Sequence, residues 1–139
     1  MTTEIHQKVE SAIQAWLEGL DSGNLDLMVK HTADSVIVCN EYTPTMIGIE
    51  AFKNKYAPNM AALNFKSTCT TQEIQLIGTD VALWVGRFTV HATSKQSGET
   101  LKNGTGRLIM VLREIEGTWK VILDVDNNDE TDKKPTTAA

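Results

Sequence analysis

Long hydrophobic runs are missing from this sequence, and cysteine is scarce. No stretch of about 18 consecutive apolar residues occurs, so no transmembrane helix is expected. The opening residues, MTTEIHQKVE, are polar and charged and lack the apolar segment of a signal peptide. The two cysteines, Cys39 and Cys69, lie far apart and form no CxxC motif, which fits a reducing compartment. We therefore expect a cytoplasmic protein.

An excess of positive charge and the common cofactor motifs are also missing. The chain carries 13 Lys and Arg against 18 Asp and Glu, a formal charge of −5, whereas nucleic-acid binding favours clustered basic residues. No glycine-rich phosphate loop occurs. The histidines His6, His31 and His91 share no metal-ligand spacing with one another or with a carboxylate. These absences predict no metal site, no cofactor, and neither a nucleic acid nor a membrane as partner.

The apolar residues that are present follow two periods within a chain of 139 residues, a common size for one domain. Helical spacing in the first part predicts three helices and, among them, one short strand. The helices are expected over 4–20, 25–31 and 48–62, and the strand over 35–40. From Asn64 onward the period is two, which predicts four successive strands. These are expected over 65–78, 81–93, 100–115 and 118–125.

The order of these elements predicts an α+β fold. Helices that precede a meander of antiparallel strands favour three N-terminal helices packed on a strongly curved antiparallel β-sheet, which gives a cone-shaped roll. The interior of such a cone is a natural place for a small-molecule pocket. Beyond Asn128 the chain is polar and has no apolar anchor. We therefore expect a single domain over 1–128 and a disordered tail over 129–139.

The last two predicted strands form a hairpin with a two-residue turn at the Glu-Gly pair 116–117. Ile109 would then lie opposite Asp124. Arg107 would lie opposite Asp126 on the same sheet face, because side chains alternate across a sheet. Two interpretations of these charges stay open. They either form part of a pocket wall, or Arg107 and Asp126 form an ion pair at the rim of the cone.

Four segments carry a resemblance to a known superfamily. They are IQAWLEGLDSGNLDLMVKHTADSVIV, PTMIGIEAFKNKY, GTDVAL and EGTWKV, and together they extend over roughly residues 5 to 128. In their order and spacing the chain resembles the nuclear transport factor 2-like superfamily and, within it, the SnoaL-like and steroid-isomerase-like branch. The resemblance implies the cone-shaped fold. It leaves the chemistry open, because this fold hosts many activities and also pure binding roles.

Three positions argue against steroid isomerase activity. Members of that branch use a tyrosine on the first helix, an aspartate base after the first strand and a protonated aspartic acid on a late strand. The resemblance puts Trp16, Asn40 and Val111 at these places, and none of them supplies the same proton chemistry. A further family tyrosine is matched by Tyr56. The resemblance thus implies the outline of the pocket without the isomerase machinery.

The strand segment ALWVGRFT resembles the association domain of calcium/calmodulin-dependent kinase, in which an arginine points into the pocket. This match implies that Arg87 points inward, and the isomerase branch implies the same for Asp124 and Asp126. Trp84 and Phe88 would then lie on the outer face of the sheet. Their apolar surface there predicts a homodimer.

Two kinds of function remain open. The first is a SnoaL-like pocket that binds a small molecule without catalysis, or an oligomerisation module. The second is an enzyme of the polyketide cyclase, isomerase or dehydratase type, in which Asp124 acts as acid or base and Arg87 or Arg107 orients the substrate. His91 stays open between a pocket group and a surface residue. The expected ligand-binding residues are Trp16, Asn40, Tyr56, Arg87, Arg107 and Asp126. We also expect an arginine to hydrogen-bond Asp124 or Asp126, and a cavity to open beside them.

Overall fold

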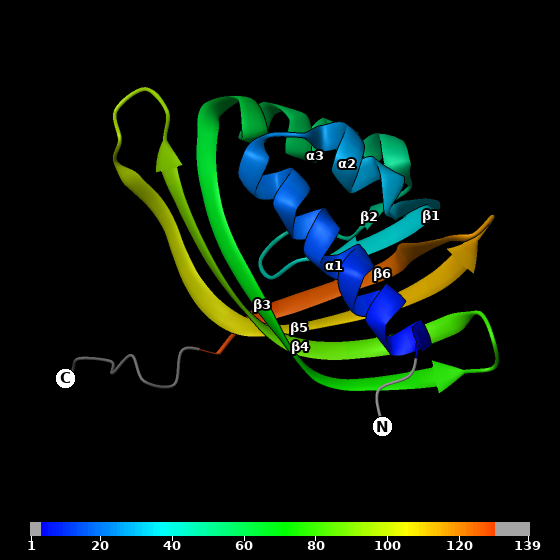
Figure 1. Cartoon of the computed structure of the whole chain (residues 1–139). Helices are drawn as coiled ribbons and strands as arrows, with labels where there is room; N and C mark the ends of the chain where they lie inside the picture. Colours follow the sequence, from blue (N-terminus) through cyan, green and yellow to red (C-terminus); the bar gives the residue numbers. More distant parts are fainter. Residues whose placement is uncertain (1–3, 130–139) are drawn as a thin grey trace.

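The computed structural model describes residues 4–129, and Figure 1 shows how their helices and strands are arranged. The helices are α1 (Glu4–Ser22), α2 (Leu25–Lys30) and α3 (Ile49–Ala62). The strands are β1 (Thr32–Cys39), β2 (Met46–Ile47), β3 (Leu63–Ile77), β4 (Val81–Ser94), β5 (Thr100–Ile115) and β6 (Thr118–Asn128). The prediction of a disordered tail over 129–139 lies outside the described residues, apart from Asp129. No helix in the described part is long and apolar enough to cross a membrane.

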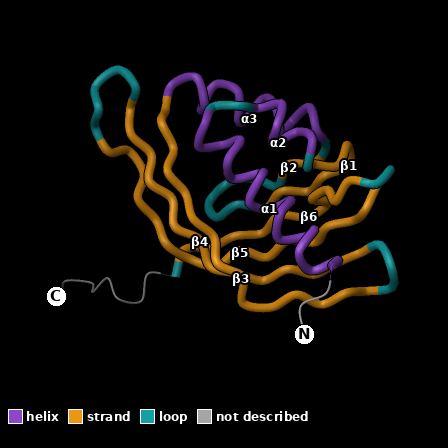
Figure 2. Tube along the Cα trace, in the orientation of Figure 1, coloured by secondary structure: helices purple, strands orange, loops and turns teal. Residues whose placement is uncertain are grey.

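The predicted α+β cone is confirmed. The six strands form one sheet in the order β2-β1-β6-β5-β4-β3. The long strands β3, β4 and β5 curve strongly, and the three helices lie within the concave side of the sheet (Figures 1 and 2). All neighbouring strands run antiparallel except β1 and β6, which are parallel. The sequence did not predict β2, since this strand has only two residues, which pair with Ile37 and Val38.

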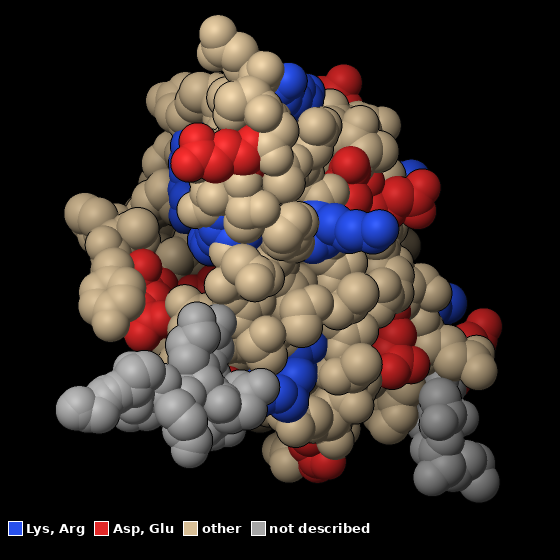
Figure 3. Space-filling view, turned by 90° about the vertical axis from the view of Figure 1, so that its left-hand side faces the viewer, with Lys and Arg blue, Asp and Glu red and all other residues tan. Residues whose placement is uncertain are grey.

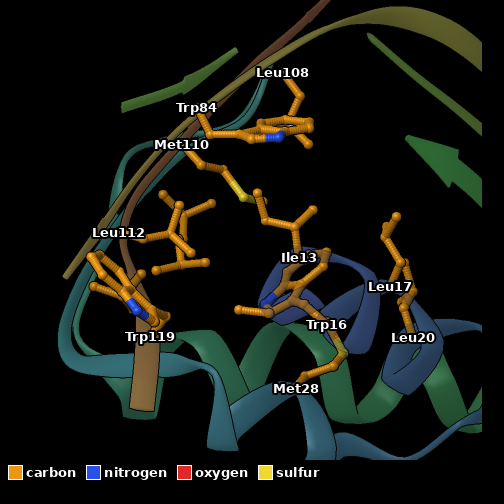
Figure 4. Packing of buried hydrophobic residues seen from close by; sticks show 14 of the residues in the cluster. Ile13, Trp16, Leu17, Leu20, Met28, Trp84, Leu108, Met110, Leu112 and Trp119 are labelled. Atoms are coloured by element: carbon orange, nitrogen blue, oxygen red, sulfur yellow. The ribbon is translucent and has the colours of Figure 1, made fainter. Parts of the chain in front are cut away.

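The helices are held by an apolar stripe and by local caps. One side of α1 is buried because its apolar residues recur at helical spacing. The side chain of Asn24 caps α2 by accepting a hydrogen bond from the backbone N–H of Leu27 at 3.1 Å. Gly48 precedes α3 with a φ of 99°, a value that glycine adopts without steric cost. The core lies between these helices and the sheet. Figure 4 shows part of it, with Ile13, Trp16, Leu17, Leu20 and Met28 facing Trp84, Leu108, Met110, Leu112 and Trp119.

Two glycines let the long strands approach their neighbours closely near the middle of the curve. A Cβ atom at Gly106 would lie 2.1 Å from the backbone oxygen of Asn127. A Cβ atom at Gly86 would lie 2.4 Å from the backbone oxygen of Thr70 and would also overlap the indole ring of Trp84. Glycine inside a strand commonly marks such a bend or close approach. The curvature that gives the cone its interior therefore depends on these positions.

The hairpin of β5 and β6 has the predicted turn, but its register changes along the strands. The predicted register holds from the turn as far as Leu112, which pairs with Val121. A β-bulge follows, in which Ile122 is the extra residue, so that Asp124 pairs with Met110. The predicted partner was the neighbouring isoleucine, and that prediction is wrong. A one-residue slip exchanges the two faces of a strand. The bulge therefore puts Asp124 on the face of the hairpin with the buried residues Leu108, Met110 and Leu112, which is the concave one.

Candidate functional site

A cavity of about 230 Å³ opens between α1, α3 and the concave side of the sheet. Its wall combines aromatic and aliphatic side chains with hydrogen-bonding groups. The apolar wall includes Trp16, Leu17, Leu20, Tyr56, Phe65, Phe88, Leu108 and Met110. The polar groups include Asn40, Glu41, Lys55, Ser67, Lys102, Asp124 and Asp126. This combination of an apolar surface with a few placed polar groups is typical of a small-molecule site.

Asp124 is the most perturbed group in the cavity wall. Asp124 is 3% exposed, and its Oδ1 atom has no hydrogen-bond partner among the described residues. Burial, together with the negative charge of Asp126, raises the pKa of this carboxyl to about 7, against the opposing effect of the positive charge of Lys55. Near neutral pH the carboxyl is therefore present both as a proton donor and as an acceptor.

Asp126, two residues further along β6, is firmly held. Its Oδ2 atom accepts a hydrogen bond from Asn40 Nδ2 at 3.0 Å, and its Oδ1 atom accepts one from the backbone N–H of Glu41 at 3.1 Å. The side-chain oxygen of Asn40 in turn accepts a hydrogen bond from Lys55 Nζ. Asn40 follows the end of β1, and Lys55 comes from α3. The hydrogen bonds from Asp126 to Asn40 and from Asn40 to Lys55 thus connect the sheet to α3 at the edge of the cavity.

Trp16 and Tyr56 form an aromatic corner of the cavity. Their ring centroids lie 5.9 Å apart in an edge-on arrangement. The indole N–H of Trp16 donates to Thr32 Oγ1 at 3.2 Å, and that hydroxyl donates to the backbone oxygen of Met28 at 2.7 Å. Burial raises the pKa of the Tyr56 hydroxyl well above its usual range, and the charges of Asp124 and Asp126 add to this effect. Tyr56 therefore stays neutral, and the Trp16 N–H is already used inside the protein.

The two arginines predicted to line the pocket lie on the other side of the sheet. Arg87 pairs with Arg107 across β4 and β5, and its guanidinium donates to both carboxylate oxygens of Asp129, at 2.8 and 2.7 Å. Arg107 Nε lies 3.8 Å from the same carboxylate. Neither arginine lines the cavity. The alternative interpretation, an ion pair between Arg107 and Asp126, is wrong, because the bulge places Asp126 opposite Leu108 on the concave face.

The assignment of the two faces of β4 is also wrong. Trp84 is completely buried in the core, and Phe88 lines the cavity. Trp84 Nε1 donates to Thr71 Oγ1 at 2.9 Å. Val111, the position matched to the isomerase's late-strand acid, faces the convex side, since its neighbours Met110 and Leu112 are buried. His91 does not line the cavity.

Sequence reasoning missed Lys55, Ser67 and Cys69 as cavity residues. Lys55 directly precedes the predicted pocket residue Tyr56, but adjacent helix residues do not share a face, so Tyr56 did not indicate it. Ser67 and Cys69 share the inward face of β3, and their alternation in a threonine-rich strand gave little signal. Ser67 Oγ is buried without a hydrogen-bond partner in the described part of the chain. Burial raises the pKa of the Cys69 thiol to about 12, so this residue is a poor nucleophile.

Both cysteines are free thiols. This finding does not test the location of the protein in the cell, so the cytoplasmic location stays a prediction. Within residues 4–129, no group of three or more His, Cys, Asp or Glu side chains could hold a metal ion.

The family follows from the sequence itself. The model of the SnoaL-like domain matches residues 9–123, which is most of the chain. The chain belongs to the SnoaL-like family. No curated protein matches it.

Several solved structures share the fold of this SnoaL-like protein. A ketosteroid isomerase-like protein from Erwinia carotovora atroseptica superposes with a TM-score of 0.78 at 16% identity, covering 91% of this chain and 97% of the other. A conserved protein from Planctomyces limnophilus gives a TM-score of 0.81 at 16% identity, covering 90% and 98%. A nuclear transport factor 2-like superfamily protein from Salmonella enterica gives 0.75 at 16% identity, covering 95% and 96%. At such low identity the similarity establishes the fold and leaves the ligand open.

Proposed function

We propose that this SnoaL-like protein binds a small, mainly apolar molecule in its cavity and holds an oxygen atom of that molecule at Asp124. The unpartnered Oδ1 atom of Asp124 carries this proposal. A buried polar atom without a partner costs about 1–3 kcal/mol of stability, so native proteins retain few of them. Such violations concentrate at functional sites, where a ligand supplies the missing partner. Ser67 Oγ, the second unpartnered atom in the cavity wall, supports the same interpretation.

The size of the cavity limits the ligand. Drug-sized ligands occupy pockets of about 300–1,000 Å³. A cavity of about 230 Å³ is smaller than this range and suits a compact molecule such as a substituted single ring. A pure assembly module would be expected to fill this interior with its own side chains. The open volume therefore favours ligand binding over a role in assembly alone.

Acid–base catalysis is the second candidate, and the protonation of Asp124 favours it. A catalytic carboxyl is most effective when its pKa lies near the working pH, and burial raises the pKa of Asp124 to about 7. Lys55, in place of the predicted arginines, is the cation whose charge acts on Asp124. In this mechanism ionised Asp124 removes a proton from a carbon next to a carbonyl group and returns it at another position. The ligand regains the proton that it loses, so this step needs no cofactor.

A screen of small ring compounds by thermal shift tests binding. We expect compounds with a carbonyl or hydroxyl group to raise the melting temperature of the natural protein. Asp124→Asn should reduce these shifts, because the amide cannot both donate and accept at the same atom. Asp34→Asn changes an exposed aspartate on β1 and serves as the matched control. Shifts that are equal in all three proteins would rule out Asp124 as the binding group.

Proton exchange tests catalysis separately. A carbonyl compound found in the screen is incubated in D₂O with the protein, and its α-protons are followed by NMR. Exchange that is fast with the natural protein and slow with Asp124→Asn would support the enzyme. Binding without any protein-dependent exchange would contradict the catalytic candidate and support the proposal of a binding protein.

A homodimer is also proposed, on a different surface from the one predicted. Two rows of half-buried apolar residues cross the convex face of β4, β5 and β6. The rows are Leu83–Val111–Leu123 and Val85–Ile109–Val125. Such a contiguous apolar patch commonly marks an interface between subunits.

A further inference from the structure

Two lysines from different elements line the cavity. Lys55 comes from α3 and is half-buried, whereas Lys102 comes from β5 and is exposed. Asp124 is deeply buried. The lysines therefore lie at the end of the cavity nearer to solvent, and the unpartnered carboxyl lies at the inner end. No carboxylate of the described residues lies within ion-pair distance of either ammonium group.

Two further carboxylates of the cavity wall, Asp126 and Glu41, are already engaged by the protein. Asp126 accepts hydrogen bonds from Asn40 and from the backbone of Glu41. The carboxylate of Glu41 accepts two from Asn128, from its backbone N–H at 2.7 Å and from its Nδ2 at 2.9 Å. These bonds hold both acids in place. The two lysines thus keep charge available for a ligand.

Lys55 is also oriented in advance. Its ammonium donates to Asn40 Oδ1 and lies 5.3 Å from the centre of the Tyr56 ring. An ammonium group has three N–H donors, so two remain after the bond to Asn40. Burial lowers the pKa of Lys55, and the nearby positive charge of Lys102 adds to this effect against the opposing charges of Asp124 and Asp126. An anion between the two lysines would relieve their repulsion.

We infer that the ligand is a compact apolar carboxylic acid with a second oxygen atom, its carboxylate held between Lys55 and Lys102 and its second oxygen held by Asp124. This inference rests on the proposed function and names the ligand class for the same cavity. Oxo acids and hydroxy acids with one ring have this arrangement of groups. The aromatic corner of Trp16 and Tyr56 would contact the ring. On the face shown in Figure 3, basic and acidic side chains are interspersed, so this face carries no large basic surface.

The experiment compares each acid with its own primary amide. We would use phenylpyruvate, mandelate and 4-hydroxyphenylacetate, and measure binding of acid and amide by calorimetry at low salt. Ionic hydrogen bonds contribute more than neutral ones, so the acids should bind roughly tenfold more tightly than the amides. The preference should shrink as salt is added, because the charges lie near the surface.

Variants assign the preference to the two lysines. Lys102→Gln should reduce the ratio of acid to amide affinity several-fold and leave amide affinity nearly unchanged, since this side chain is exposed. Lys55→Gln should reduce the ratio further. Lys53→Gln is the matched control, because Lys53 lies on the same helix and pairs with Glu50 at the surface. If Lys55→Gln does not fold, Lys102→Gln and the charge reversal Lys102→Glu still decide the matter.

The outcomes separate this inference from the proposed function. Equal binding of acids and amides, with both reduced by Asp124→Asn, would overturn the anion site and leave the Asp124 pocket standing. An acid preference that Lys53→Gln changes as much as Lys102→Gln would also overturn it. If neither acids nor amides bind, or if Asp124→Asn has no effect on either, both proposals fail. A tenfold preference that depends on Lys55 and Lys102 supports both.

Discussion

Asp124 and Asp126 lie two residues apart on the concave side of β6, yet their carboxyl groups differ in hydrogen bonding. Asp126 accepts two hydrogen bonds, whereas Asp124 Oδ1 accepts none from the described residues. The pKa of Asp124 is about 7 in the folded protein, against 3.8 for the ordinary side chain. The difference makes Asp124 a source of pH-dependent stability.

The folded protein holds the Asp124 proton over a pH range in which the unfolded chain has lost it. Below about pH 4 the carboxyl is protonated in both states, and its cost is absent. Between about pH 4 and 7 the unfolded chain binds fewer protons, so the free energy of unfolding falls as the pH rises. At 1.36 kcal/mol per pKa unit the loss reaches at most about 4 kcal/mol by pH 7. We expect Asp124→Asn to abolish this loss and to be the more stable protein above pH 7.

Urea unfolding of both proteins between pH 4 and 8 measures this effect. The difference between the natural protein and Asp124→Asn cancels most contributions from other titrating groups. A difference that stays constant with pH would mean that the carboxyl is not buried as described. Asp34→Asn, at an exposed site, should show no such pH-dependent difference.

Gly106 is expected to tolerate no side chain. Gly106→Ala would place Cβ 2.1 Å from the backbone oxygen of Asn127, and the backbone of a neighbouring strand cannot easily move. We expect a loss of about 1–3 kcal/mol in the free energy of unfolding. Gly104→Ala is the matched control on the same strand, because its Cβ would meet the side-chain oxygen of Asn128 at 2.6 Å, and a side chain can shift more easily than backbone. Chemical denaturation should show little change for Gly104→Ala, and equal losses would contradict the steric explanation.

The convex face should lose its dimer when a charge enters it. Ile109 lies between Val85 and Val125 in one of the two apolar rows. Ile109→Lys would bury an unpaired ammonium in the interface and should weaken dimerisation by about 2 kcal/mol or more, roughly 30-fold. Sedimentation velocity over a range of concentrations measures this. Ile77→Lys, at a 58% exposed site on β3, should leave the association unchanged. A natural protein that remains monomeric at micromolar concentration would disprove the dimer.

The sequence was sufficient for the fold because periodicity reports directly on which residues are buried. The helical spacing in α1 and the alternation in the long strands both depend on many residues, so a single irregularity does not hide them. The faces of the strands are different, since each depends on one register. The bulge at Ile122 exchanges the faces beyond it, and a bulge leaves no fixed signature in one sequence.

The two aspartates caused the wrong choice of concave face. Because the resemblance implies that Asp124 and Asp126 point inward, the face of β4 with Trp84 and Phe88 was expected on the outside. The simpler rule, that the most apolar face forms the core, would have placed Trp84 correctly. It would still have missed Asp124, because only the bulge brings that carboxyl to the core side. Lys55 was missed for a different reason, since its partner Asn40 lies on a loop whose position the sequence does not determine.

The hydrogen bonds that join Asn40 to Asp126 and Lys55 should be worth more together than separately. Asn40→Leu keeps a similar volume but leaves one carboxylate oxygen and the ammonium without their amide partner. We expect a loss of about 1–3 kcal/mol in the free energy of unfolding. In the double variant with Lys55→Met, the two losses should not add, and the coupling energy should be about 1 kcal/mol.

Thr43→Val provides the control for this cycle. The Thr43 hydroxyl also bonds to Asn40, but to its backbone oxygen and at an exposed position, at 2.9 Å. Its loss should cost less and should add to that of Lys55→Met. Urea unfolding of the single and double variants measures each loss in the free energy of unfolding and the coupling energies. Additive losses for Asn40→Leu and Lys55→Met would mean that Lys55 is not held by Asn40. The ammonium would then lack the fixed position that the carboxylate-binding arrangement requires.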